Sequence, residues 1–136
     1  MVVGAVMSPA LAGAAPAAAP RATGDRPVTI SSNCTGFCFV PAQVTIATGD
    51  TVTWVNHSGA VHNVTRCSPA GCNGAAGGTG TDTTFTAGNV ASASGATFRH
   101  TFTVPGTYRY FCIPHEQMGM IAEVEVLAGP RGHGFR

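Results

Sequence analysis

The sequence of 136 residues contains no lysine, so its seven basic residues are all arginines, set against six acidic residues. Charged residues make up only 10% of the chain, and the formal net charge at pH 7 is +1. A nucleic-acid-binding protein would need a basic surface, so this composition argues against one. The length leaves room for one domain, which argues against a large multidomain enzyme.

Sustained helical periodicity is also missing. No segment repeats apolar residues every three or four positions, so a helical bundle is not expected. Hydrophobic residues nevertheless make up 44% of the chain, which is too many for a disordered protein. Together with 18 glycines and 9 prolines, the many threonines and valines favour short strands joined by turns.

The N-terminal segment, residues 1–20, carries no charged side chain. Its apolar run from Val2 to Leu11, followed by small residues, is typical of an export signal, although the usual basic start is missing. A disordered linker rich in Ala and Pro is the alternative. Pro9 and Pro16 interrupt the segment, so we expect no membrane span in the mature protein. An exported protein would lie outside the cell, in the cell envelope or in the periplasm.

The cysteine count of five is odd. Four cysteines form two close couples, Cys34/Cys38 and Cys67/Cys72, and in an exported protein these four are candidates for disulfide bonds. Three connectivities are possible, and the sequence does not choose among them. Cys112 is left over, far from the others along the chain. Such a thiol is either buried and inert or occupied by a ligand.

Apolar and polar residues alternate through much of the chain after the N-terminal segment. Val52 and Trp54, for example, share one face of a strand whose other face is polar. Similar segments add up to about seven or eight short strands, for which a two-sheet antiparallel β-sandwich is the natural closure. We therefore predict an all-β domain over residues 27–128. The last residues, 129–136, have no such pattern and are expected to form a flexible tail.

Soft ligand types gather after a predicted strand near the C-terminal end of this domain. Cys112, His115, Met118 and Met120 lie within nine residues of one another. Thiolate, imidazole and thioether suit copper, whereas structural zinc sites use Cys and His without a thioether. A trigonal copper site needs one more imidazole, and His62 supplies it from the edge of another predicted strand.

These motifs resemble those of the blue copper proteins, the cupredoxins, and most closely the plastocyanin-like branch. The resemblance covers about residues 28–127 and rests on Phe39-Val40-Pro41, Asp50 to Asn56, Val61 to Val64, and Gly106 to Met120. It implies a Greek-key sandwich with one type 1 copper ion and one-electron exchange with redox partner proteins. It also implies His62, Cys112 and His115 as equatorial ligands, Met120 as the axial ligand, and Asn63 as the residue that ties the ligand loops together.

The sequence departs from the plastocyanin pattern in the loop 68–80 and in the two cysteine couples. With six acidic residues in all, it also shows no acidic patch for docking a basic partner. Because of these departures the identity of the redox partner stays undecided. They do not affect the prediction of the copper site. Of the two methionines, Met120 is favoured as the axial ligand by its spacing and by the preceding Gly119, and Met118 would then belong to the surface beside His115.

Three functions are compatible with this group of candidate ligands. We expect a monomeric electron carrier rather than an enzyme, because a type 1 copper ion has no open position for a substrate. Copper storage or delivery is the alternative, although ligands from two distant loops favour retention of the ion. The third is a nucleophilic Cys112 with His115 as its base, but His62 and Met120 would have no role in acyl transfer.

Overall fold

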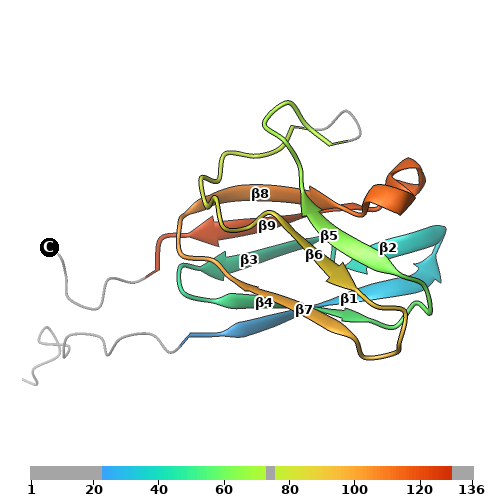
Figure 1. The fold of residues 1–136 in the computed structure, drawn as a ribbon. Helices are drawn as coiled ribbons and strands as arrows, with labels where there is room; N and C mark the ends of the chain where they lie inside the picture. The colour runs from blue at the N-terminus through green and yellow to red at the C-terminus, as the bar shows by residue number, and fades with distance from the viewer. Residues whose placement is uncertain (1–22, 73–75, 130–136) are drawn as a thin grey trace, which may run out of the picture.

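The computed structural model describes residues 23–72 and 76–129, and within them it contains nine β-strands and one short 3-10 helix, η1 (Figure 1). The predicted signal at residues 1–20 and all but the first residue of the predicted tail lie outside these ranges, so both stay predictions. The elements are β1 (Asp25–Cys34), β2 (Gly36–Val40), β3 (Gln43–Ala47), β4 (Thr51–Asn56), β5 (His62–Arg66), β6 (Ala87–Val90), β7 (Thr97–Thr101), β8 (Gly106–Phe111), η1 (Ile113–Met118) and β9 (Ile121–Leu127).

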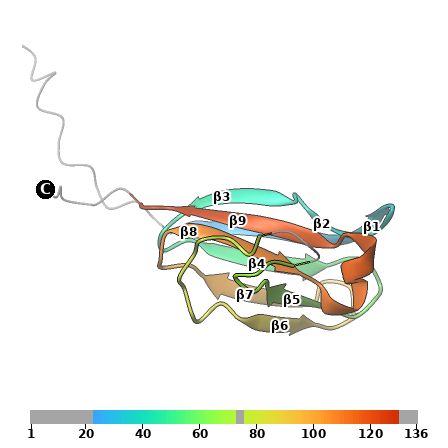
Figure 2. The ribbon, with the colours of Figure 1, turned by 90° about the horizontal axis from the view of Figure 1, so that it is seen from above.

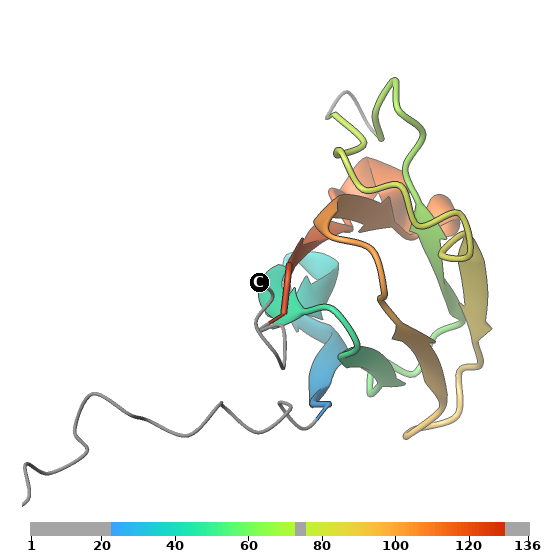
Figure 3. The ribbon, with the colours of Figure 1, turned by 90° about the vertical axis from the view of Figure 1, so that its left-hand side faces the viewer.

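The strands form two sheets, with the orders β2-β1-β4-β7 and β3-β9-β8-β5-β6. Figure 3 looks along the molecule and shows strands of both sheets around a common interior. The predicted all-β sandwich is confirmed, with nine strands in the described residues instead of seven or eight. The purely antiparallel arrangement needs correction, because β1 pairs in parallel with β4, and β3 with β9. The reason is that the chain leaves the first sheet after β2, forms β3 in the second sheet, and returns to the first as β4.

The alternation read from the sequence corresponds to the two faces of the strands. In β4 every second residue is buried, and Val52 and Trp54 are both fully enclosed. The Trp54 ring stacks on Phe85 with 5.9 Å between ring centroids and meets Tyr110 edge-on at 5.3 Å. Each large apolar side chain buried in this way stabilises the fold by about 1.5–3 kcal/mol. This core fixes β4 and β8, which lead to the site described below.

The β3–β4 turn shows how local sequence sets a strand boundary. Gly49 has φ +92°, a conformation that side chains with a Cβ rarely adopt. The buried Asp50 carboxylate accepts hydrogen bonds from the backbone N–H of Gly24, at 2.8 Å, and of Ala47, at 3.0 Å. The Thr48-Gly49-Asp50 turn therefore also anchors the start of β1.

Helix η1, the β1–β2 hairpin and the start of β5 gather at one end of the sandwich, as the views in Figures 1 and 2 agree. In the described ranges no helix has the length and apolar character that a membrane span requires. The end of the sandwich that carries η1 brings together the ligand types singled out in the sequence.

Candidate metal centre

Cys112 occupies the junction between β8 and η1 and is fully buried. Its backbone N–H donates to the carbonyl of Met120, at 3.1 Å, and its carbonyl accepts from the N–H of His115, at 3.1 Å. The Asn63 backbone N–H points at the sulfur, with 3.4 Å between N and Sγ. Hydrogen bonds of both the backbone N–H and the backbone carbonyl of Cys112 therefore fix the direction of its thiol. Among the described cysteines it is the one without a disulfide.

His62 opens β5 and is 1% exposed. Its Nδ1 lies 3.6 Å from Cys112 Sγ, and its Nε2 lies 2.7 Å from the hydroxyl of Ser58. That hydroxyl donates its only hydrogen to Asn56 Oδ1, at 2.8 Å, so it accepts a hydrogen bond from Nε2–H of His62. The network therefore selects the tautomer whose Nδ1 lone pair faces the sulfur.

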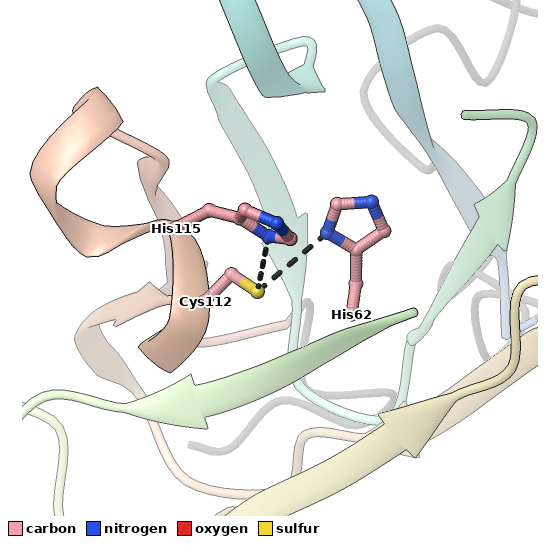
Figure 4. Close-up of side chains that lie close together, drawn as sticks. All are labelled: His62, Cys112 and His115. Atoms are coloured by element: carbon pink, nitrogen blue, oxygen red, sulfur yellow. Dashed lines mark hydrogen bonds between the residues drawn. The ribbon is translucent and has the colours of Figure 1, made fainter. Parts of the chain in front are cut away.

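His115 reaches the same sulfur from η1. Pro114 is the second residue of this short helix, which turns the chain back, so that His115 Nδ1 lies 3.3 Å from Cys112 Sγ. Figure 4 shows both imidazoles directing a nitrogen toward the sulfur from opposite elements, β5 and η1. The His115 ring is half-buried, whereas that of His62 is enclosed. The more accessible edge of the site is therefore His115.

The three donor atoms fit a single metal ion. The two ring nitrogens and the sulfur all lie within 4.8 Å of one another. Bond lengths of about 2.3 Å to sulfur and about 2.0 Å to nitrogen, as in zinc sites, would separate trigonal ligand atoms by about 3.7 Å. The sulfur–nitrogen distances of 3.6 and 3.3 Å are close to this value. One thiol with two imidazoles is a donor set that suits copper.

The protonation states agree with a ligand role. Burial, together with the nearby charge of His115, lowers the pKa of His62 to about 4, so this imidazole is neutral near pH 7. Burial raises the pKa of the Cys112 thiol, and hydrogen bonds from the backbone of Asn63 and His115 oppose that rise. A metal ion would therefore have to displace the thiol proton but no proton from His62.

Two further residues of the predicted site lie beside these three. The side-chain oxygen of Asn63 accepts hydrogen bonds from the Ile113 N–H, at 2.9 Å, and from the Thr65 hydroxyl, at 2.8 Å, and so joins β5 to the start of η1. Met120 is fully buried, and its carbonyl pairs with Cys112. Met118, in contrast, is 54% exposed. Burial therefore favours Met120 over Met118 as the thioether near the sulfur.

The structure joins each cysteine couple internally. Cys34 pairs with Cys38 inside the β1–β2 hairpin, and Cys67 pairs with Cys72 in the loop after β5. Of the three connectivities that the sequence left open, this is the one between nearest neighbours. Neither disulfide includes Cys112.

Two residues that touch the imidazoles, Ser58 and Phe37, carry no sequence signal of such a role. Ser58 lies in the connection between β4 and β5, where a serine is ordinary. Phe37 lies between two half-cystines, and its contacts with His62 and His115 depend on how the hairpin folds over the site. A pattern in the chain could not reveal either contact.

Known proteins are similar to this chain in sequence and in fold. The chloroplastic plastocyanin of Tetradesmus obliquus is 34% identical over 102 residues, which are 73% of this chain and 65% of that protein. The plastocyanin of Scenedesmus fuscus is 33% identical over 105 residues, or 75% of this chain and 99% of that protein. The crystal structure of amicyanin from Paracoccus versutus superposes with a TM-score of 0.53 and 26% identity, over 85% of this chain and 87% of that one.

The match to a described family covers the sandwich except for the first two residues of β1. Residues 27–127 fit the family described as copper binding proteins, plastocyanin/azurin family. This range runs from β1 to the last residue of β9 and includes both imidazoles and the thiol of the site. The chain therefore belongs to the plastocyanin/azurin family of copper-binding proteins.

Proposed function

We propose that this protein is an exported one-electron carrier that holds one copper ion through His62, Cys112 and His115, with Met120 as the axial ligand. One observation carries the proposal: two imidazole nitrogens and a thiol sulfur, from different elements, converge at one end of the sandwich. When bound, copper supplies the Cu(I)/Cu(II) couple, and the axial thioether and the surroundings of the sulfur tune its potential.

The protein chain holds the donor atoms in fixed positions. Cys112 is fixed by backbone pairing, His62 by the Ser58 hydroxyl, and the Asn63 side chain joins the two segments that carry them. Ligand atoms that keep their places in both oxidation states need little rearrangement when an electron moves. All four predicted ligands are assigned to the ion, so the proposal includes no catalysis.

Titration of the purified protein with Cu(II) tests this function directly. We expect one ion to bind per chain, with an intense visible thiolate-to-copper band that bleaches on one-electron reduction and returns on reoxidation. Slow electron self-exchange combined with easy loss of copper would instead favour storage or delivery. A folded protein that takes up no copper, or that shows no thiolate band, would overturn the proposal.

Export to an oxidising compartment is the second part of the proposed function. The Cys34–Cys38 and Cys67–Cys72 disulfides would persist outside the cytoplasm but not within it. The uncharged apolar segment 1–20 supplies the corresponding signal. Mass spectrometry of the protein from fractionated source cells should find a shortened N-terminus in the periplasmic, envelope or external fraction. An intact N-terminus confined to the cytosol would contradict export.

The surface around His115 suits a partner that is not recognised by charge. Val61, Ile113 and Met118 are 61%, 55% and 54% exposed at this end of the sandwich. The segments 32–40, 57–61 and 113–119, which surround the site, contain a single formally charged residue, Glu116. We therefore propose that redox partners dock here through apolar contact, with the carrier acting as a monomer.

Electron self-exchange between two copies should accordingly respond little to salt. Charge-steered association changes rates by about 10- to 1,000-fold. We expect less than a threefold change between about 0.01 and 1 M ionic strength, over which the screening length falls from about 30 to 3 Å. The matched control is Ile113→Glu, which places like charges on both copies and should give a slower rate that rises with salt. A steep salt dependence of the unmodified protein would contradict apolar docking.

A further inference from the structure

The β1–β2 hairpin ends in a tip that is closed by its own disulfide. Cys34 lies opposite Gly36 in the pairing of the two strands, and the register shifts between Ser31 and Cys34. The Cys34–Cys38 bond spans this irregular tip, with a Cα–Cα distance of 6.3 Å. Three residues are therefore enclosed in a small ring, and the third of them is Phe37.

Phe37 packs on both imidazoles of the metal centre. Its ring centroid lies 4.9 Å from that of His62, in an edge-to-face arrangement, and 4.5 Å from that of His115, in a tilted one. The two imidazole centroids are themselves 4.6 Å apart. The three rings thus form one cluster. Each imidazole is in contact with the sulfur of Cys112 through its Nδ1 and with Phe37 through its ring.

The hairpin tip also meets the helix that carries His115. Gly36 has φ +95°, and a Cβ placed on it would lie 3.2 Å from the sulfur of Met118. The tip therefore approaches η1 closely enough that only glycine fits without displacing that side chain. His115 itself departs from helical geometry, with φ −118° and ψ 18°, so helical pairing alone does not fix its backbone.

Burial alone does little to restrain the hairpin tip. Residues 32–36 are all exposed, and exposed hairpin tips open locally at little cost in free energy. Phe37 is half-buried, so the packing that it gains over the site is only partial. A covalent link within the hairpin reduces the number of conformations in which Phe37 leaves the imidazoles.

We propose that the Cys34–Cys38 disulfide holds Phe37 in place as a positioning residue, which fixes the orientation of both imidazoles of the metal centre. Phe37 contributes no donor atom and acts through His62 and His115. The inference depends on the proposed copper function for its metal-based readouts but not for its structural one. The second disulfide, Cys67–Cys72, touches neither imidazole and provides a matched control.

The first experiment compares the rate at which Cu(I) passes from the protein to a competing chelator, together with the reduction potential. Phe37→Ala should speed release by about tenfold, the effect expected for the loss of two aromatic contacts. Phe37→Tyr should restore the rate to within about threefold, because the ring is kept. The Cys34→Ser/Cys38→Ser variant should speed release and shift the potential in the same direction as Phe37→Ala.

Combining Phe37→Ala with removal of the hairpin disulfide distinguishes a positioning role of Phe37 from a general loss of stability. If the disulfide acts through Phe37, adding Phe37→Ala to the Cys34→Ser/Cys38→Ser variant should have less effect than Phe37→Ala alone. The Cys67→Ser/Cys72→Ser control should keep the potential and release rate of the unmodified protein. Equal effects of the two disulfide variants, or full additivity, would overturn the proposal. Phe37→Leu, which removes the aromatic ring but leaves a larger apolar side chain than alanine, provides a second variant if Phe37→Ala fails to fold.

A readout without copper keeps this inference distinct from the proposed function. In the metal-free protein, nuclear Overhauser contacts should join the Phe37 ring to the rings of His62 and His115. These contacts should weaken in the Cys34→Ser/Cys38→Ser variant and persist in Cys67→Ser/Cys72→Ser. Contacts that survive unchanged after removal of the hairpin disulfide would overturn the proposal that this disulfide holds Phe37 in place. A protein with the expected contacts but no copper binding would refute the proposed function alone.

Discussion

Cys112→Ala should abolish the visible thiolate-to-copper band and reduce copper affinity by more than about 100-fold. Cys112 is the one described cysteine outside a disulfide, so no other described residue can supply a thiolate. Loss of a neighbour that merely orients a ligand costs about 10–100-fold in affinity, and loss of the sulfur ligand itself should cost more. Absorption spectra at one equivalent of Cu(II) and competition with a chelator measure the two effects.

Thiol chemistry supplies the control for this variant. The unfolded, metal-free protein should react with one equivalent of an alkylating reagent, and Cys112→Ala with none, because the other four cysteines are paired. Bound copper should protect the folded protein from alkylation. A band that persists in Cys112→Ala would refute the ligand assignment. Alkylation that copper does not slow would instead favour the nucleophile hypothesis.

The sequence predicts those parts of the fold that depend on local pattern. Alternation places Val52 and Trp54 on one face, and the structure buries both. Successive side chains of a strand point to opposite faces whichever strand it pairs with, so this pattern can be predicted without knowing the pairing. The ligand segment can also be predicted from local sequence, since Cys112 and His115 are three residues apart in a turn after a strand. His62 was predicted from the need for a second imidazole, and the structure brings it to the same sulfur.

Long-range contacts account for what the sequence could not predict. Alternation does not indicate strand direction, so the parallel pairing of β1 with β4 was missed. The same holds for side chains that meet only after folding. Asp82 in a loop and His100 in β7 form a hydrogen bond, with 2.9 Å between Oδ2 and Nε2, that no spacing in the sequence predicts. Phe37 and Ser58 were missed for this reason, although both touch a predicted ligand.

Ser58→Ala should lower copper affinity by about 10–100-fold and leave the fold intact. The Ser58 hydroxyl is held by Asn56, whose side-chain nitrogen donates to the carbonyls of Ala60 and Ala91, both at 2.7 Å. That chain of bonds keeps the Nε2–H of His62 paired and its Nδ1 turned to the sulfur. Without the hydroxyl, the buried imidazole loses its partner and can adopt the other tautomer, which presents N–H to the metal.

Ser94→Ala is the matched control for this effect. Ser94 also pairs with an imidazole, that of His57, at 3.3 Å, but both residues are exposed and His57 lies outside the donor cluster. Copper affinity should therefore stay within about threefold of the unmodified protein, and Ser58→Thr, which keeps a hydroxyl, should recover most of the loss. Nitrogen chemical shifts of His62 in the metal-free protein report the tautomer directly. An unchanged tautomer and affinity in Ser58→Ala would mean that burial alone orients His62, and that the Asn56–Ser58 network is dispensable for the site.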